Sequence, residues 1–275
     1  NTVLSYLPSK LTKAEGAANV ALQSIAALQK VAEMAGLPSD GSPDSISKLR
    51  LVLSLADSAP DDMLYLRHEG LRHPHAHEAI KKSKGILEEI KGCKSVLNTR
   101  LYLDMAPTEQ ELKSAILVLR EGDAWYRVFQ GGWRKAIAVH RQLQREKVKT
   151  NAAARLTELE ELLSVTQKYE AWRNDGELRT FANASFKDDQ TPLHELAELT
   201  GWVDTSVKCL QSAQIGLHVF DPLTVSMERL AQLRNIKSGV EKALADLAAF
   251  ESVQKQEFPA LKLPTPIPIS QNTMR

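Results

Sequence analysis

The stretch that decides the fold runs from Ala124 to His140 and reads AWYRVFQGGWRKAIAVH. It gathers several aromatic side chains in a chain that is only 5% aromatic. Aromatic side chains at this density are typical of a core at which several helices meet. A pair of glycines separates two helical patterns inside the stretch, so we expect a junction between helices here. The aromatic residues are Trp125, Tyr126, Phe129 and Trp133.

Helical periodicity extends from this stretch in both directions. Apolar residues recur at spacings of three and four over most of the chain, and no alternating strand pattern interrupts them. We therefore predict an all-α fold, an elongated antiparallel helical bundle with coiled-coil character and about seven helices. The predicted helices cover residues 12–35, 45–58, 76–103, 108–122, 151–174, 191–215 and about 221–255, and a further basic helix follows the aromatic stretch.

Local signals predict where several of these helices begin. Thr108 and Glu111 have the spacing of a capping box, in which each side chain binds the backbone of the other residue. Asp221 followed by Pro222 has the pattern of an N-cap and first helical residue, so we expect the last helix to open there. The segment from about 175 to 190 is predicted to be a loop that touches the core through its phenylalanines.

The first predicted helix carries an alanine-rich apolar seam at heptad spacing. Small residues on a seam allow a neighbouring helix to approach closely. The seam predicts either packing within the bundle or self-association with a second copy of the chain. Its positions are Leu11, Ala14, Ala18, Ala21, Ile25, Leu28, Ala32 and Ala35.

The predicted domain covers residues 1–257, with 1–104 and 105–257 as alternative subdomains. Residues 258–275 are rich in proline and are expected to form an extended linker or tail. The sequence begins with Asn1 rather than methionine. Together the two ends predict a piece of a longer protein, so the rest of that parent protein is an expected partner.

The charge balance and the cysteine content restrict the partners and the cellular location that we expect. The 35 basic and 34 acidic side chains give a formal net charge of +1, which argues against general polyanion binding but leaves local patches open. The two cysteines, Cys93 and Cys209, lie far apart, so we expect no disulfide framework and a reducing, cytoplasmic location. No apolar run reaches the length of a membrane span.

A basic run follows the aromatic residues. Residues 127 to 149 include seven basic side chains and one acidic side chain, Glu146. Basic residues interleaved with aromatic ones suit a DNA or RNA surface, where cations meet phosphates and flat rings meet bases. The same spacing also suits core aromatics beside a solvated face, and the sequence leaves both open. The candidate nucleic-acid-binding residues are Arg127, Arg134, Lys135, Arg141, Arg145, Lys147 and Lys149.

Four of the seven histidines fall between residues 68 and 77, and a metal site is one interpretation of this cluster. An extended backbone would place His73, His75 and His77 on one side. No cysteine lies nearby, and we expect a solvated histidine-rich loop, with no metal and no cofactor; metal binding stays the alternative.

The sequence contains no motif that supports catalysis. It lacks the phosphate-binding patterns GxxxxGK[ST] and GxGxxG, and it lacks HExxH and CxxC. It also lacks the Glu-x-x-His spacing of di-metal helical bundles. We therefore expect no enzymatic activity in this chain.

The order of features from about residue 97 to 219 resembles a known family. An aromatic segment with Phe129-x-x-x-Trp133-Arg134-x-Ala136 leads into a basic helix. A leucine-rich stretch at 156–172 and a helix at 193–202 follow. This order resembles the helical, coiled-coil-like insertion of large bacterial superfamily 1 helicase-type ATPases associated with defence. The resemblance implies an accessory region that contacts nucleic acid or partner domains and leaves ATP hydrolysis to the parent protein.

A structural role is the alternative function. Helices with long apolar stripes also build oligomerisation or adaptor modules that have no nucleic-acid partner. The first helix and the last predicted helix are the candidate surfaces for a homo-oligomer.

Overall fold

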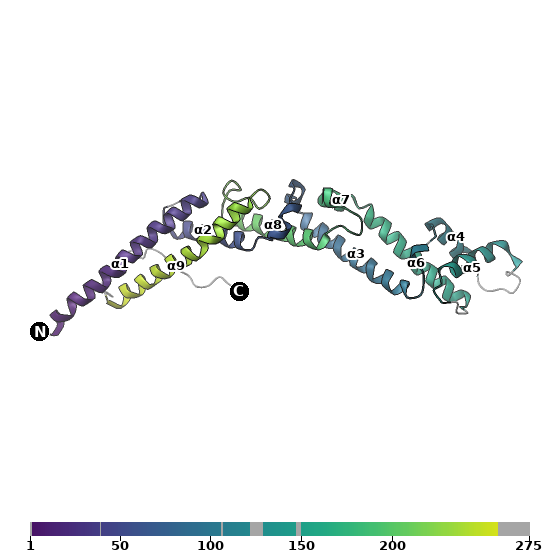
Figure 1. The fold of residues 1–275 in the computed structure, drawn as a ribbon, viewed down its shortest axis with the longest axis horizontal. Coiled ribbons are helices and arrows are strands. Elements are labelled where there is room, and N and C mark those ends of the chain that lie inside the picture. The colour runs from purple at the N-terminus through teal and green to yellow at the C-terminus, as the bar shows by residue number, and fades with distance from the viewer. Residues whose placement is uncertain (1, 39, 106, 122–128, 147–149, 258–275) are drawn as a thin grey trace. The chain divides into compact units, whose positions relative to one another are not determined.

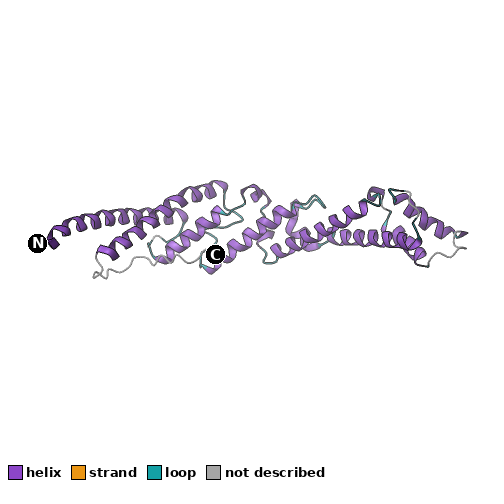
Figure 2. Ribbon diagram, turned by 90° about the horizontal axis from the view of Figure 1, so that it is seen from below, coloured by secondary structure: helices purple, strands orange, loops and turns teal. Residues whose placement is uncertain are grey.

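The computed structural model describes residues 2–38, 40–105, 107–121, 129–146 and 150–257. Its regular elements are helices, and no β-strand occurs in these ranges; two isolated bridges join Leu101 to Gln144 and Lys187 to Asp189. The chain is therefore all-α, as predicted (Figure 2). The α-helices are α1 (Thr2–Ala35), α2 (Pro43–Asp57), α3 (Ala76–Asn98), α4 (Glu109–Arg120), α5 (Gly131–Leu143), α6 (Ala152–Arg173), α7 (Gly176–Ala182), α8 (Leu193–Ser212) and α9 (Met227–Glu257).

The contacts divide the chain into two compact units (Figure 1). Unit 1 combines residues 1–72 with residues 198–275, and unit 2 is the continuous segment 73–197. Short 3-10 helices at Asp61–Leu66 and Glu69–Arg72 belong to unit 1. Unit 1 is thus built from both ends of the chain, a grouping that local periodicity does not reveal.

In unit 1, α1 packs against α9 in antiparallel fashion. The Ser24 hydroxyl donates to Asp246 at 3.4 Å, and Arg229 donates to the Met34 carbonyl, so residues from opposite ends of the sequence pair in reverse order. The seam predicted on α1 is buried over its second half and not over its first, where Leu11 is exposed. The buried seam residues are Ala21, Leu28, Ala32 and Ala35, and those of α9 include Leu230, Leu233, Val240 and Leu247.

Polar contacts tie the rest of unit 1 to these helices. The Arg234 guanidinium binds the Asp61 carboxylate and donates to the carbonyls of Ala56 and Ala59 at 2.9 and 3.1 Å. The Trp202 indole donates to the Leu55 carbonyl at 3.1 Å and so holds α8 against α2. Backbone carbonyls at the end of α2 thereby gain hydrogen-bond donors from α8 and α9 in addition to local ones.

In unit 2, α6 lies against α3 and α4. The Trp172 indole donates to the Ser83 carbonyl at 3.0 Å, and the Tyr169 ring stacks on Trp172 with 5.9 Å between centroids. At the exposed margin Lys168 pairs with Glu89 at 2.6 Å. The buried apolar side chains of these helices form the core of unit 2.

Of the two helix starts predicted from capping patterns, one is confirmed and the other is wrong. The capping box of α4 is confirmed: Thr108 accepts from the Glu111 amide at 3.3 Å, and Glu111 accepts from the Thr108 amide at 2.8 Å. The predicted start at Asp221 is wrong. Asp221 instead holds a turn and binds Arg72 at 2.9 Å, and α9 begins at Met227, where the Ser226 hydroxyl accepts from the Arg229 amide at 3.1 Å.

The predicted loop at 175–190 contains a short helix, α7. Asp175 caps it by accepting from the amides of Glu177 and Leu178, at 2.9 and 3.1 Å. Burial of Phe181 and Leu178 holds this short element in place. Tertiary packing therefore overrides a segment whose polar and small residues favour a loop.

The expected aromatic core around residues 125–133 is wrong where it can be checked. Phe129 is 71% exposed and Trp133 is only half-buried. Trp125 and Tyr126 lie outside the described residues. The buried aromatic side chains lie elsewhere, at Trp172, Trp202, Phe181 and Phe220.

No helix in the described ranges is long and apolar enough to cross a membrane.

Leu28 tests the pairing of α1 with α9. Leu28→Ala leaves a cavity at a position that is 4% exposed, and we expect the free energy of unfolding to fall by about 2–4 kcal/mol. Leu22→Ala on the same helix is the matched control, because Leu22 is 64% exposed; its change should stay below about 0.5 kcal/mol. Urea unfolding followed by circular dichroism measures both, and equal losses would contradict this packing.

Asp221 should make unit 1 sensitive to acid. Burial alone would raise the pKa of this carboxyl, but hydrogen bonds from Arg72 and from the Leu223 amide outweigh burial and hold the pKa below its ordinary value. The stabilisation is therefore present above about pH 4 and is lost as the pH falls through the lowered pKa. Asp221→Asn should lower stability at neutral pH and flatten its decline below about pH 4. Urea midpoints measured from neutral to acidic pH test this, and parallel curves for the two proteins would refute it.

Candidate nucleic-acid interface

Helix α5 of unit 2 carries three of the four predicted basic residues that the structure describes, Arg134, Lys135 and Arg141, and helix α6 contributes to the same surface. The start of α6 is well defined, because the Asn151 side chain accepts from the Ala154 amide at 2.8 Å. The start of α5 has no such cap: Gln130 makes no side-chain hydrogen bond to the helix. The first turn of α5 also contains no acid, and Arg134 and Lys135 follow at once.

This arrangement at the start of α5 favours an external anion. The first amides of a helix have no acceptor within the helix, and the helix dipole places partial positive charge there. Acids usually occupy such positions, whereas α5 has cations. An anion bound nearby would satisfy both the amides and the basic side chains.

The segment that follows α3 holds the C-terminal end of α5 in place. The Tyr102 amide donates to the Leu143 carbonyl at 2.6 Å, and the Arg145 amide donates to the Arg100 carbonyl at 3.0 Å. These two bonds flank the bridge between Leu101 and Gln144. The last turn of α5 is therefore held against the segment that follows α3.

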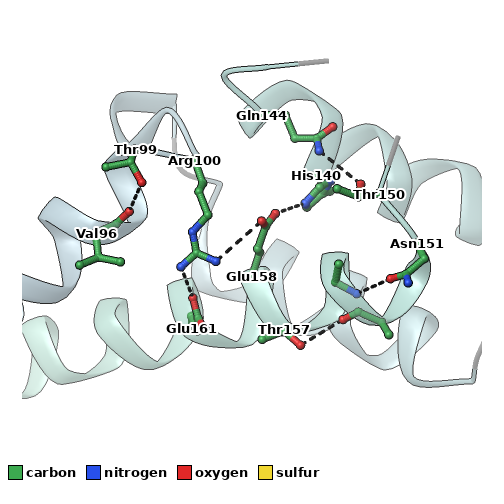
Figure 3. Close-up of polar contacts among 12 residues, drawn as sticks. Val96, Thr99, Arg100, His140, Gln144, Thr150, Asn151, Thr157, Glu158 and Glu161 are labelled. Atoms are coloured by element: carbon green, nitrogen blue, oxygen red, sulfur yellow. Dashed lines mark hydrogen bonds and ion pairs between the residues drawn. The ribbon is translucent and has the colours of Figure 1, made fainter. Parts of the chain in front are cut away.

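A buried polar contact joins α5 to α6 (Figure 3). His140 is fully buried, and its Nε2 lies 2.6 Å from the Glu158 carboxylate. Glu158 also faces Arg100 at 3.9 Å, and Arg100 pairs with Glu161 at 3.0 Å. The other imidazole nitrogen, Nδ1, is buried and has no hydrogen-bond partner among the described residues. His140 therefore depends on Glu158 for its polar contact.

On another side of α5 lies an open hollow of about 600 Å³, which we call the arginine hollow. Cationic side chains from two helices border it, and its apolar surface comes from α5 alone. None of the described residues that line it is acidic. They are Trp133, Arg134, Ile137, Ala138, Arg141, Gln142 and Arg155.

The guanidinium groups around the arginine hollow differ in how they are held. Arg134 donates to the Phe129 carbonyl at 3.1 Å, and Arg155 donates from Nε to the Thr150 hydroxyl at 3.2 Å. Arg141 is exposed. Arginine presents several N–H donors in a planar fork, so Arg155, which is held through Nε, also carries the donors of its two terminal nitrogens.

The structure brings together only part of the predicted basic set. Arg134 and Arg141 share the arginine hollow. Lys135 is also exposed on α5 but lines a separate groove of about 540 Å³ between α4 and α5. Arg127, Lys147 and Lys149 lie outside the described residues.

Arg145 has a structural engagement that the sequence does not reveal. Its guanidinium donates to Asn98 at 2.6 Å and to the Leu101 carbonyl at 3.3 Å, and it lies 4.6 Å from the centre of the Tyr102 ring. These contacts hold the connection after α3. A contact of Arg145 with a phosphate would have to compete with them.

The sequence did not predict that Arg155 and Trp133 belong to the candidate site. Arg155 belongs to α6, a helix for which the sequence indicated only an apolar side and an acidic side. Trp133 was expected in the core, but it is half-buried and lines the hollow. Its Nε1 is buried without a hydrogen-bond partner among the described residues. The only sequence signal for an aromatic ring beside a cation here is the dipeptide Trp133-Arg134. The dipeptide does not show that Arg155, from another helix, borders the same hollow.

The histidine-rich segment does not form the extended row that a metal site would need. Residues 73–75 form a turn, and α3 begins at Ala76, so His77 is helical. Nδ1 of His68 and Nδ1 of His73 accept from the amides of Gly70 and His75, at 3.1 and 3.3 Å. In the part of the chain that the structure describes, histidine, cysteine and acidic residues form no group of three that could hold a metal ion.

Comparison with family models, with curated proteins and with solved structures found no match to this chain.

Glu158 tests the contact that joins α5 to α6. Glu158→Ala leaves both nitrogens of a fully buried imidazole without a partner, and we expect the free energy of unfolding to fall by about 1–3 kcal/mol. Glu161→Ala is the matched control one turn along α6; it removes only the exposed pair with Arg100 and should cost less than about 0.5 kcal/mol. Chemical denaturation of both variants measures the difference. Similar small losses would show that His140 does not rely on Glu158.

Proposed function

We propose that this chain binds nucleic acid without catalysing a reaction, as a helical accessory region of a larger nucleic-acid-dependent ATPase. The arginine hollow is the observation that carries the proposal. Three guanidinium groups from α5 and α6 border it, and the described part of its lining contains no acid. Phosphate groups are the natural ligand of such a cluster, because arginine binds phosphate oxygens in a bidentate manner.

The near-neutral net charge makes this local cluster more informative. A chain of net charge +1 attracts polyanions only where its charges are unevenly distributed. The described residues that line the arginine hollow include three arginines and no acid, and Arg141 is exposed. This local excess of positive charge favours the α5–α6 surface as the site of contact.

A binding role fits the chemistry of unit 2 better than a catalytic one. His140 and Glu158 form a histidine–carboxylate pair at 2.6 Å, and its imidazole has no exposed surface. A substrate cannot reach a group that is fully enclosed by the core, so this pair acts in packing rather than in proton transfer. The two cysteines are free thiols, which suits a cytoplasmic protein.

The wider role rests on the resemblance to the insertion of superfamily 1 helicase-type ATPases associated with defence. In this proposal the chain forms an elongated antiparallel bundle with coiled-coil character. ATP hydrolysis would reside in the parent protein, and this region would hold or position the nucleic acid.

The second candidate function is self-association. Part of α1 carries apolar side chains that α9 does not cover, with Leu11 at 55% and Leu22 at 64% exposure. The seam first considered for this role is buried against α9 over its second half, so a second copy would have to use the exposed first half of the seam, which includes Leu11, and exposed apolar side chains beside it such as Leu22. Light scattering measures the apparent molecular mass. A mass that rises with protein concentration in the unmodified chain, and rises less in Leu22→Glu, would favour this function.

A salt-dependent DNA titration tests the main proposal. Arg141→Glu should weaken binding at least about tenfold at low salt and reduce the slope of log K against log salt by about one, because one phosphate contact is lost. Lys82→Glu is the matched control: it reverses an exposed charge on α3 in the same unit, away from the arginine hollow. Fluorescence anisotropy measures both variants. Absence of DNA binding by the unmodified chain, or an equal loss of affinity in the two variants, would refute the proposed function.

A further inference from the structure

We propose that the arginine hollow accommodates an unstacked base of an unpaired strand, and that the protein therefore prefers single-stranded nucleic acid to duplex. This inference rests on the proposed function and names the form of nucleic acid that the site takes. It is drawn from three features of the hollow: its size, its apolar wall and the placement of its cations.

The size of the arginine hollow suits a single nucleotide. Its volume of about 600 Å³ lies within the range of about 300–1,000 Å³ that is usual for small-molecule sites. A flat basic surface that only tracks a phosphate backbone does not need a hollow. An indentation of this size beside the cations provides room for a group that projects from the backbone.

The wall of the arginine hollow has the chemistry that a base requires. Trp133, Ile137 and Ala138 contribute an indole and aliphatic surface, all from α5. Trp133 is half-buried, so neighbouring side chains support the ring while part of it remains accessible. Stacking of a base on an aromatic side chain contributes about 1–3 kcal/mol and does not depend on sequence, because every base has a flat face.

The cations are placed to receive the phosphates that accompany such a base. Arg134 and Arg141 lie two turns apart on α5, and Arg155 approaches from α6. Arg134 and Trp133 also adjoin the uncapped start of α5, where the helix dipole favours an anion. Charge from two helices therefore surrounds the aromatic wall.

Base pairing decides which nucleic acid can use this combination. In a duplex the bases are stacked on one another and present only their edges, so a base reaches the indole only after it is unpaired and unstacked. A surface that recognised charge alone would favour duplex, which has the higher charge density and the steeper salt dependence. A preference for the unpaired strand is thus the signature of the aromatic wall.

The experiment compares a single strand of about 20 nucleotides with the same strand annealed to its complement, at equal salt, by fluorescence anisotropy. The unmodified protein should bind the single strand about 10-fold or more tightly than the duplex. Trp133→Leu keeps apolar bulk and removes the aromatic ring; it should weaken single-strand binding about 10- to 100-fold and leave duplex binding within about threefold. Trp133→Phe retains a ring and should stay within about fivefold of the unmodified protein on both probes.

The outcomes separate this inference from the proposed function. Duplex binding that equals or exceeds single-strand binding would overturn the inference and leave nucleic-acid binding in place. Equal losses on both probes in Trp133→Leu would assign Trp133 a structural role and would also overturn it. Absence of binding to either probe would refute the proposed function itself. Circular dichroism melting of each variant confirms that the comparison is made on folded protein.

Discussion

The contact between His140 and Glu158 is the constraint on which the candidate site depends. An imidazole with no exposed surface lies 2.6 Å from a carboxylate of the next helix, so α5 cannot turn or slide along α6 without leaving a buried polar group unpaired. Arg141 follows His140 directly in α5, and Arg155 precedes Glu158 by one turn of α6. The contact between His140 and Glu158 thereby also fixes the positions of Arg141 and Arg155 around the arginine hollow.

A different principle holds unit 1 together. Its helices meet through apolar seams, and the ends of its helices are held by side chains that donate to backbone carbonyls. Arg234 and Trp202 both bind carbonyls at or near the end of α2, from helices that follow it by more than 140 residues. Such long-range contacts give the carbonyl groups at a helix end additional hydrogen-bond donors. Each of them requires that the first and last parts of the chain already lie together.

Basic residues that look alike in the sequence have different roles in the structure. Arg145 is bound to Asn98, to the Leu101 carbonyl and to the Tyr102 ring, whereas Arg141 points to solvent at the arginine hollow. Lys135 is on the same helix as Arg141 but borders another groove. A charge run therefore identifies a region with potential for phosphate binding, and only the surroundings of each side chain show which members are available.

The sequence by itself determined the all-α class and the position of most helices, because apolar spacing and capping signals act over a few residues. Thr108 with Glu111 is an example: both partners lie within one turn, so the capping box could be predicted with its residues. The sequence also indicated the basic helix on which Arg134 and Arg141 lie. It failed at Asp221, whose bond to Arg72 spans 149 residues and replaces the expected helix start with a turn.

Only the tertiary structure decided which segments share a core and which side chains reach the surface. It brought α1 to α9 and placed Arg155 at the same hollow as Trp133. It also moved the aromatic core from residues 125–133 to Trp172, Trp202, Phe181 and Phe220. Hydrophobic burial has no direction, so the density of aromatic residues in a stretch cannot show which of them the neighbouring helices will cover. That choice depends on contacts between residues far apart in the chain, about which local periodicity carries no information.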